Sequence, residues 1–180
     1  MRIIAGKYKR RNIIWPEDVA LIRPTKDRIR EALFSALGDL TNRNVLDLYA
    51  GSGAMGIEAL SRGASFCTFV DQNKIAIKTV KANLDNLGIK EAQVLFTSDD
   101  LAIKGFILKK NKFDLVIMDP PYEKGRYEEI INTFIENDLF SENAILVTES
   151  NREIIVPEVF FIRKREYHYG EIIVTIFWRQ

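Results

Sequence analysis

The sequence predicts an α/β fold, in which a mostly parallel sheet is covered by helices on both faces and ends in an antiparallel hairpin. From residue 44 onward, apolar strand-like segments alternate with helix-like segments, and this alternation is typical of a parallel sheet. The last two apolar segments, 158–167 and 171–179, are separated by a short "HYG" turn with no helix between them. With 180 residues, of which 47% are hydrophobic, the chain can bury the core of one domain.

Residues ahead of this alternation predict a small N-terminal addition. The β-rich segments 2–6 and 11–15 flank "KYKR" and are expected to form a small hairpin or arm. Residues 23–38 have apolar side chains at helical spacing and end in a glycine, which indicates a helix. We therefore divide the chain into a basic N-terminal hairpin or arm, residues 1–22, and a main domain, residues 23–180.

The main domain is expected to contain seven strands, and its first strands are continuous apolar runs of the kind that a sheet buried on both faces requires. Strands are predicted at 44–50, 66–71, 92–98, 113–119, 143–149, 158–167 and 171–179, and helices between them at 54–63, 73–87, 100–109 and 125–137.

Positive charge is concentrated at the N-terminus. The first 30 residues carry nine Lys or Arg against three acids, although the whole chain has a net charge of only +1. A basic end on a mildly acidic body favours contact with a polyanion, and a solvated basic hairpin is the alternative. The candidate residues for a polyanion contact are Lys7, Lys9, Arg10, Arg11 and Arg23.

Composition excludes several classes of protein. Cys67 is the single cysteine, so an intrachain disulfide and a multi-thiolate metal site are ruled out, and its apolar neighbours indicate a core position. There is no apolar run of membrane-spanning length and no signal-type segment near the start. His168 lies in the predicted hairpin and is interpreted as a surface residue. We expect a cytoplasmic monomer without a metal or a membrane contact.

The segment "LDLYAGSGAMG" predicts the binding site for a cofactor. Gly51, Gly53 and Gly56 have the G-x-G-x-x-G spacing of dinucleotide sites. Gly51 and Gly53 allow a sharp turn close to a ligand, whereas Gly56 lies inside the next helix and is expected to serve helix–strand packing. Asp71 ends the following strand, 20 residues after Gly51, where a carboxylate can accept hydrogen bonds from ribose hydroxyls. Both NAD and S-adenosylmethionine (SAM) fit these residues.

Three features favour SAM over NAD. Asp47 lies within the first strand, where a carboxylate suits a cofactor with a cationic amino-acid tail. SAM has no pyrophosphate, so the positive N-terminus of the next helix needs no anion. The third feature is the segment "FDLVIMDPPY", described below. After the strand at 92–98, Asp99 or Asp100 should reach the adenine amino group, and we favour Asp99. A parallel sheet that ends in an antiparallel hairpin is the Rossmann-like arrangement of class I SAM-dependent methyltransferases.

The "DPPY" segment, residues 119–122, follows the fourth predicted strand and therefore lies beside the cofactor. An exocyclic amine of a nucleobase is a poor nucleophile, and two hydrogen-bond acceptors aimed at its hydrogens favour the positive charge that develops on nitrogen. Asp119 and the Pro120 carbonyl are the natural pair, and Tyr122 can stack on an extruded base. This pattern indicates N-methylation of an amino group, but it does not distinguish adenine, cytosine and guanine.

Over nearly its whole length the sequence resembles the RsmD-type methyltransferases, which modify guanine N2 in small-subunit (16S) ribosomal RNA. The matching segments are "MRIIAGKYKRRNI", "IRPTKDRIREALFSAL", "VLDLYAGSGAMGIEALSRGA", "FVDQN", "DPPY" and "YHYGEIIVTIFWR". The resemblance implies N2 methylation of one guanosine, on an assembling ribosomal particle. By position it assigns SAM binding to Asp47, Gly51, Gly53, Asp71 and Asp99, and base handling to Asp119, Pro120 and Tyr122. The chain departs from the family pattern at Ala5, where a glycine is common, and at the doubled acid of "SDD".

Two other functions remain as alternatives. A DNA adenine N6 methyltransferase would share "DPPY", but it usually needs a separate insert to read DNA, for which 180 residues leave no room. A catalytically silent RNA-binding assembly factor would be expected to have lost "DPPY" or the glycine segment, and both are intact. The sequence leaves open the target nucleotide and whether the substrate is naked RNA or a protein-bound particle.

Overall fold

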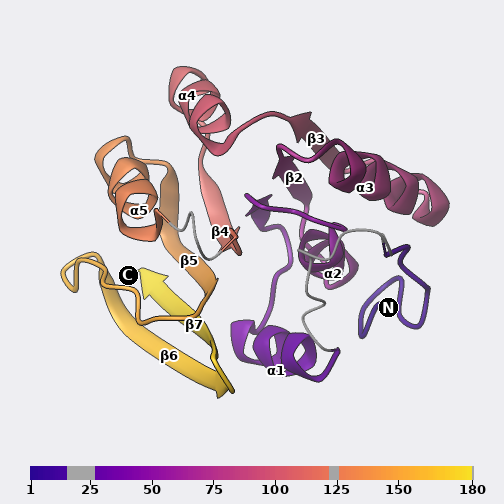
Figure 1. Cartoon of the computed structure of the whole chain (residues 1–180), viewed down its shortest axis with the longest axis horizontal. Coiled ribbons are helices and arrows are strands. Elements are labelled where there is room, and N and C mark those ends of the chain that lie inside the picture. The colour runs from indigo at the N-terminus through magenta and orange to yellow at the C-terminus, as the bar shows by residue number, and fades with distance from the viewer. Residues whose placement is uncertain (16–26, 122–125, 180) are drawn as a thin grey trace.

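The computed structural model describes residues 1–15, 27–121 and 126–179, and these residues form a seven-stranded sheet with helices on both faces (Figure 1). The strands are β1 (Asn44–Asp47), β2 (Phe66–Asp71), β3 (Ala92–Phe96), β4 (Phe113–Met118), β5 (Phe140–Ser150), β6 (Phe161–Tyr169) and β7 (Ile172–Arg179). The helices are α1 (Asp27–Leu37), α2 (Ala54–Ser61), α3 (Lys74–Leu87), α4 (Asp99–Lys109) and α5 (Tyr127–Glu136).

The sheet is mostly parallel and ends in an antiparallel hairpin, as predicted. Its strand order is β3-β2-β1-β4-β5-β7-β6. The first five strands pair in parallel, whereas β7 is antiparallel to both β5 and β6. The chain runs from β1 outward to β3 and then returns to place β4 on the other side of β1, so strand order reverses between β1 and β4. Ligands of open α/β sheets bind at such a reversal, beyond the carboxyl ends of the strands.

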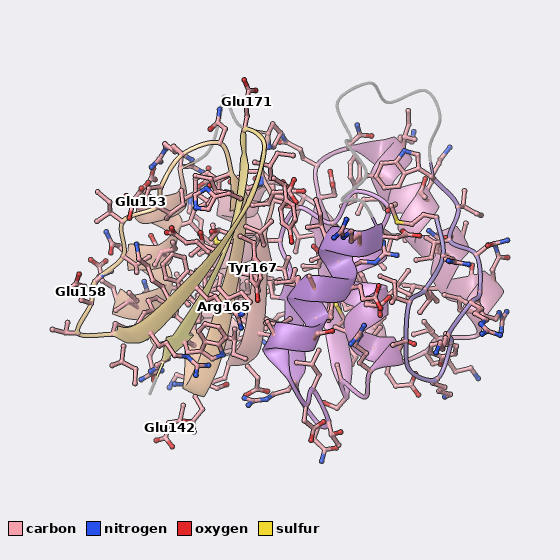
Figure 2. All side chains as sticks on the ribbon, turned by 90° about the horizontal axis from the view of Figure 1, so that it is seen from below. Glu142, Glu153, Glu158, Arg165, Tyr167 and Glu171 are labelled. Atoms are coloured by element: carbon pink, nitrogen blue, oxygen red, sulfur yellow. The ribbon has the colours of Figure 1, made fainter. Side chains whose placement is uncertain are left out.

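Each face of the sheet has its own core. Residues of α1, α2 and α3 pack on one face, and residues of α4 and α5 pack on the other (Figure 1). The second core contains a run of phenylalanine rings in edge or tilted contact, such as Phe106 and Phe113 with centroids 5.1 Å apart. The edge strand β6 twists past α1, and Figure 2 shows Arg165 and Tyr167 on it beside that helix.

Helix boundaries follow from capping residues. The Asn73 side chain accepts hydrogen bonds from the first amides of α3, and Gly88, with φ of 69°, ends that helix. Ser98 caps α4, so the helix begins at Asp99, one residue earlier than expected. The strand expected at 44–50 is shorter, because the chain leaves the sheet at Asp47 to form the glycine turn, and β5 extends beyond the expected range at both ends.

The N-terminal segment forms a tight hairpin that packs against α2 and α3. Arg2 and Asn12 form an antiparallel bridge, and Lys7 N donates to Ser61 O at 2.7 Å. Gly6 has a φ of +81°, and a Cβ there would lie 1.7 Å from the Ser61 carbonyl oxygen. The family commonly has glycine at both positions 5 and 6. In this structure only position 6 requires a glycine, so an alanine is accommodated at position 5.

Other expectations about single residues can be compared with the structure. Cys67 is fully buried in the core, as predicted. His168 has a side chain 62% exposed and lies 3.6 Å from Glu166, in agreement with a surface position. Among the described helices, none has the length and apolar character needed to cross a bilayer.

Candidate active site

Four carboxylates lie at the carboxyl ends of neighbouring strands. Across the sheet they are Asp71 at the end of β2, Asp47 at the end of β1, Asp119 just after β4, and Glu149 near the end of β5. Because these four strands are parallel, the carboxylates gather at one edge of the sheet, beside the reversal of strand order. This edge is therefore rich in carboxyl groups.

The glycine turn lies at the same edge and depends on left-handed backbone. Gly51 has a φ of 55° and Gly53 a φ of 80°, conformations that side chains with a Cβ rarely adopt. Gly51 N donates to Asp71 Oδ2 at 2.9 Å, so the β2 carboxylate holds the turn in place. Gly56 has a different role: a Cβ there would lie 2.3 Å from the Phe69 ring, so this glycine permits close packing of α2 on β2, as predicted.

Asp47 is a buried carboxylate beneath the turn. Its residue surface is only 3% exposed, and Oδ2 accepts a hydrogen bond from Gly56 N at 3.0 Å. Burial raises its pKa to about 7 and the Asp71 charge adds to this, whereas the Gly56 hydrogen bond opposes it. The protein thus retains a carboxyl group whose ionisation is disfavoured without a nearby cation.

Asp99 and Asp100 occupy different surroundings. Asp99, with a side chain 20% exposed, accepts a hydrogen bond from the Tyr49 hydroxyl at 2.6 Å, whereas the Asp100 side chain is 59% exposed. Burial acts to raise the pKa of Asp99, but hydrogen bonds from Tyr49, the Asp100 amide and Arg126 outweigh it and lower the pKa. Asp99 is therefore the acid that is linked to the glycine turn, because its hydrogen-bond partner Tyr49 lies just before that turn in the sequence.

Arg126 joins two elements that border the site. At the start of α5 it lies 3.3 Å from Asp99 and 2.9 Å from Asp100, both in the first turn of α4. These carboxylates raise its pKa, with the Asp100 hydrogen bond contributing most. Tyr49 and Arg126 were not among the predicted site residues, because their roles depend on a contact between segments far apart in the chain.

Asp119 and Pro120 stand at the end of β4, at the centre of the carboxylate row. Asp119 is partly buried and Pro120 is buried. Burial raises the pKa of Asp119 well above its usual range, and the charges of Glu149 and Asp47 raise it further. The predicted residues Tyr122 and Arg23 lie outside the described residues.

Glu149 is a further residue that the sequence analysis missed. It is 9% exposed and lines a recess together with Asp119. The expected strand 143–149 ended at this residue, so the rule that ligands bind at the carboxyl ends of parallel strands could have identified it.

The predicted RNA-binding residues of the N-terminal hairpin have exposed side chains. Lys7, Lys9, Arg10 and Arg11 all lie on its surface. Arg11 donates to the Asn86 carbonyl at 2.7 Å, and the Lys7 ammonium lies 5.2 Å from the centre of the Tyr8 ring. Tyr8 itself is only 9% exposed, so its ring packs against the protein and is not presented for stacking on RNA.

Comparison with known proteins identifies the family to which this chain belongs. Residues 1–178 match the protein family described as "Conserved hypothetical protein 95". Ribosomal RNA small subunit methyltransferase D of Escherichia coli (strain K12) is 32% identical over 183 residues, covering all of this chain and 90% of the relative. This chain belongs to the family of the ribosomal RNA small subunit methyltransferases D. The resemblance stated from the motifs is thereby confirmed.

Two further relatives support the family and the fold. "Putative rRNA methyltransferase YlbH" of Bacillus subtilis (strain 168) is 35% identical over 181 residues, covering 98% of each chain. Among solved structures, "Putative methyltransferase yhhF" from Escherichia coli superposes with a TM-score of 0.86 at 32% identity, covering all of this chain and 98% of that one. This chain therefore has the fold of that solved methyltransferase, a class I SAM-dependent methyltransferase sheet, and the match includes the N-terminal hairpin.

Proposed function

We propose that this protein uses SAM to methylate the exocyclic N2 amine of a guanosine in small-subunit ribosomal RNA. Membership in the methyltransferase D family supports a SAM-dependent methyltransferase that acts on ribosomal RNA. The position of Asp119 and Pro120 in the carboxylate row carries the proposal of N-methylation at an exocyclic amine. The resemblance of the motifs to RsmD-type enzymes supports guanine N2 as that amine.

The carboxylate row fits a cationic cofactor. Burial, and after it the neighbouring carboxylates, raise the pKa of Asp47 and of Asp119, so negative charge at this edge is unfavourable by itself. A sulfonium and an ammonium group would offset that charge, whereas the pyrophosphate of NAD would add to it. Asp71 would accept from the ribose hydroxyls, Asp47 would face the cationic amino-acid tail, and Asp99 would lie near the adenine.

Bound SAM supplies an electrophilic methyl group on its sulfonium sulfur. Asp119 and the Pro120 carbonyl would accept hydrogen bonds from the two N2 hydrogens and hold the amine in position for attack. These acceptors bind more strongly as positive charge develops on nitrogen, which lowers the barrier. The raised pKa of Asp119 also suits it to take the proton that the methylated nitrogen releases.

The substrate is proposed to be an assembling small-subunit particle in the cytoplasm, bound by a monomer. The exposed basic residues of the N-terminal hairpin would contact phosphates, which position a protein on RNA without reading sequence. Specificity for one nucleotide would then come from shape and from an unstacked base, which an assembled particle can present. Arg23 and Tyr122 remain predicted contacts to RNA and to the base.

The proposed chemistry is tested with Asp119→Ala. We expect the variant to bind SAM normally in calorimetry, and to lose about 100-fold or more in turnover on small-subunit particles, the scale for removal of one such acceptor. Asp71→Ala is the complementary variant, because Asp71 is proposed to bind the ribose hydroxyls and its loss should weaken SAM binding. Equal turnover by Asp119→Ala and the unmodified protein would contradict the assignment.

A further inference from the structure

Glu149 and Asp119 are neighbours across the sheet. Met118 of β4 pairs with Thr148 of β5. Asp119 and Glu149 are the next residues along these two parallel strands, so they lie at the same level of the sheet. Strands in a sheet lie about 5 Å apart. Because Ile117 and Val147 both face the core beneath α1 and α2, the alternation of side chains turns Asp119 and Glu149 to that same face.

The two carboxylates share one recess with apolar walls. Its other described lining residues are Leu33 of α1, Met55 of α2, and Ile117, Met118, Val147 and Val174 of the sheet. In a mostly apolar recess, a few convergent polar groups fix the orientation of a bound ligand. The Tyr127 hydroxyl donates to the Glu149 carbonyl at 2.6 Å, which fixes the backbone of β5 at this point.

Placing these carboxylates together has an electrostatic cost. The Glu149 charge raises the pKa of Asp119, after the larger effect of burial. A ligand with adjacent hydrogen-bond donors can bind to both carboxylates at once. Among the nucleobases with an exocyclic amine, guanine alone presents a donor beside that amine, because its N1 carries a hydrogen. Adenine N1 and cytosine N3 are acceptors, which a carboxylate would repel.

We propose that Glu149 determines specificity for guanine by accepting a hydrogen bond from guanine N1–H while Asp119 and Pro120 hold the N2 amine. This inference rests on the proposed function and adds to it the group that selects the base. Glu149 touches the substrate base at N1 and takes no part in methyl transfer. A site built to accept from N1–H rejects a base whose N1 is an acceptor, because two lone pairs then face each other.

The test compares guanosine with 2,6-diaminopurine riboside at the nucleotide mapped as methylated. Diaminopurine keeps the 2-amino group but has an acceptor at N1. We expect the unmodified protein to favour guanosine by about 100-fold or more in kcat/KM. In Glu149→Gln the amide can donate to N1 of diaminopurine, so the preference should fall by at least tenfold or reverse. Glu142→Gln is the matched control, because Glu142 lies in the same strand and its side chain points into solvent (Figure 2).

The outcomes separate this inference from the function on which it rests. If the unmodified protein forms no N2-methylguanosine, the proposed function fails. If it does, and Glu149→Gln folds, binds SAM and keeps the original preference for guanosine, Glu149 is only structural and this inference is overturned. If Glu149→Gln does not fold, Glu149→Asp replaces it: the shorter carboxylate should lower kcat/KM more on guanosine than on diaminopurine, and equal losses on the two bases, or equal kcat/KM of the unmodified protein on them, overturn the inference.

Discussion

A buried glutamate in α2 should hold the N-terminal hairpin to the main domain. Glu58 has a fully buried side chain, and its oxygens accept hydrogen bonds from Ile4 N at 2.9 Å and Ala5 N at 3.1 Å. Arg62 Nε donates to it at 2.8 Å, and Arg30 Nε lies 3.7 Å away with its own side chain fully buried. We predict that Glu58→Gln strongly destabilises the protein.

The magnitude follows from these contacts. Glutamine is nearly the same size but neutral, so Arg30 would lose its buried carboxylate partner and keep only the ion pair with Asp27 at 3.2 Å, although burial already lowers the pKa of Arg30. The NH2 group of the glutamine would also face the N–H of Ile4 or Ala5, so two hydrogen-bond donors would meet without an acceptor. Breaking a buried ion pair by removing one partner typically costs about 3 to 5 kcal/mol, and we expect Glu58→Gln to fall in that range.

Urea unfolding at pH 7 measures this free energy, with Glu31→Gln as the control, because Glu31 is exposed on α1. Hydrogen exchange adds a local readout: the amides of Ile4 and Ala5 should lose protection in Glu58→Gln before the strands of the sheet do. A change below about 1 kcal/mol, the scale of a surface pair, would refute the reasoning.

Two other predictions concern the N-terminal hairpin and the site. Gly6→Ala should lower the free energy of unfolding by more than Gly38→Ala does in the same urea assay, by roughly 1 to 3 kcal/mol. Both glycines have positive φ, but a Cβ at Gly6 meets the Ser61 carbonyl at 1.7 Å and one at Gly38 meets nothing within 4 Å. Equal losses of stability in Gly6→Ala and Gly38→Ala would contradict this prediction, because they would show that the Ser61 carbonyl moves away from the added Cβ at no cost. Asp47→Asn should raise the free energy of unfolding at pH 8 by about 1 to 4 kcal/mol, and should raise it little at pH 4. Because the pKa of Asp47 is about 7 in the folded protein against 3.8 for an ordinary aspartate, its ionisation lowers stability as pH rises between those values. Urea unfolding at both pH values tests this, and a gain that is independent of pH would contradict it.

Patterns within short segments predicted much of the fold. Alternation of apolar strands and helices indicated the sheet, and the short turn between the last two strands indicated the antiparallel hairpin, because these features depend on local periodicity. The packing role of Gly56 was also predictable, since a glycine inside a helix that follows a strand usually marks close approach.

Contacts between distant segments could not be predicted in this way. Glu58 lies in "AMGIEALS" and resembles a solvent-facing helical residue, because nothing local indicates that residues 4 and 5 will pack over it. The Tyr49–Asp99 hydrogen bond likewise joins residues 50 positions apart. The carboxylate row follows from strand order, and the separation in sequence of Asp71 and Glu149 gives no sign that their strands end at one edge.

The central claim is that the protein methylates guanine N2 in small-subunit ribosomal RNA. The direct measurement is incubation of small-subunit particles from cells lacking the gene with the purified protein and methyl-labelled SAM, followed by digestion of the RNA to nucleosides and chromatography with mass spectrometry. The account predicts that the label is recovered as N2-methylguanosine from a single site. Label on adenine N6 would contradict the choice of guanine, and label on a ribose or a ring carbon would contradict the role of Asp119 and Pro120 as well.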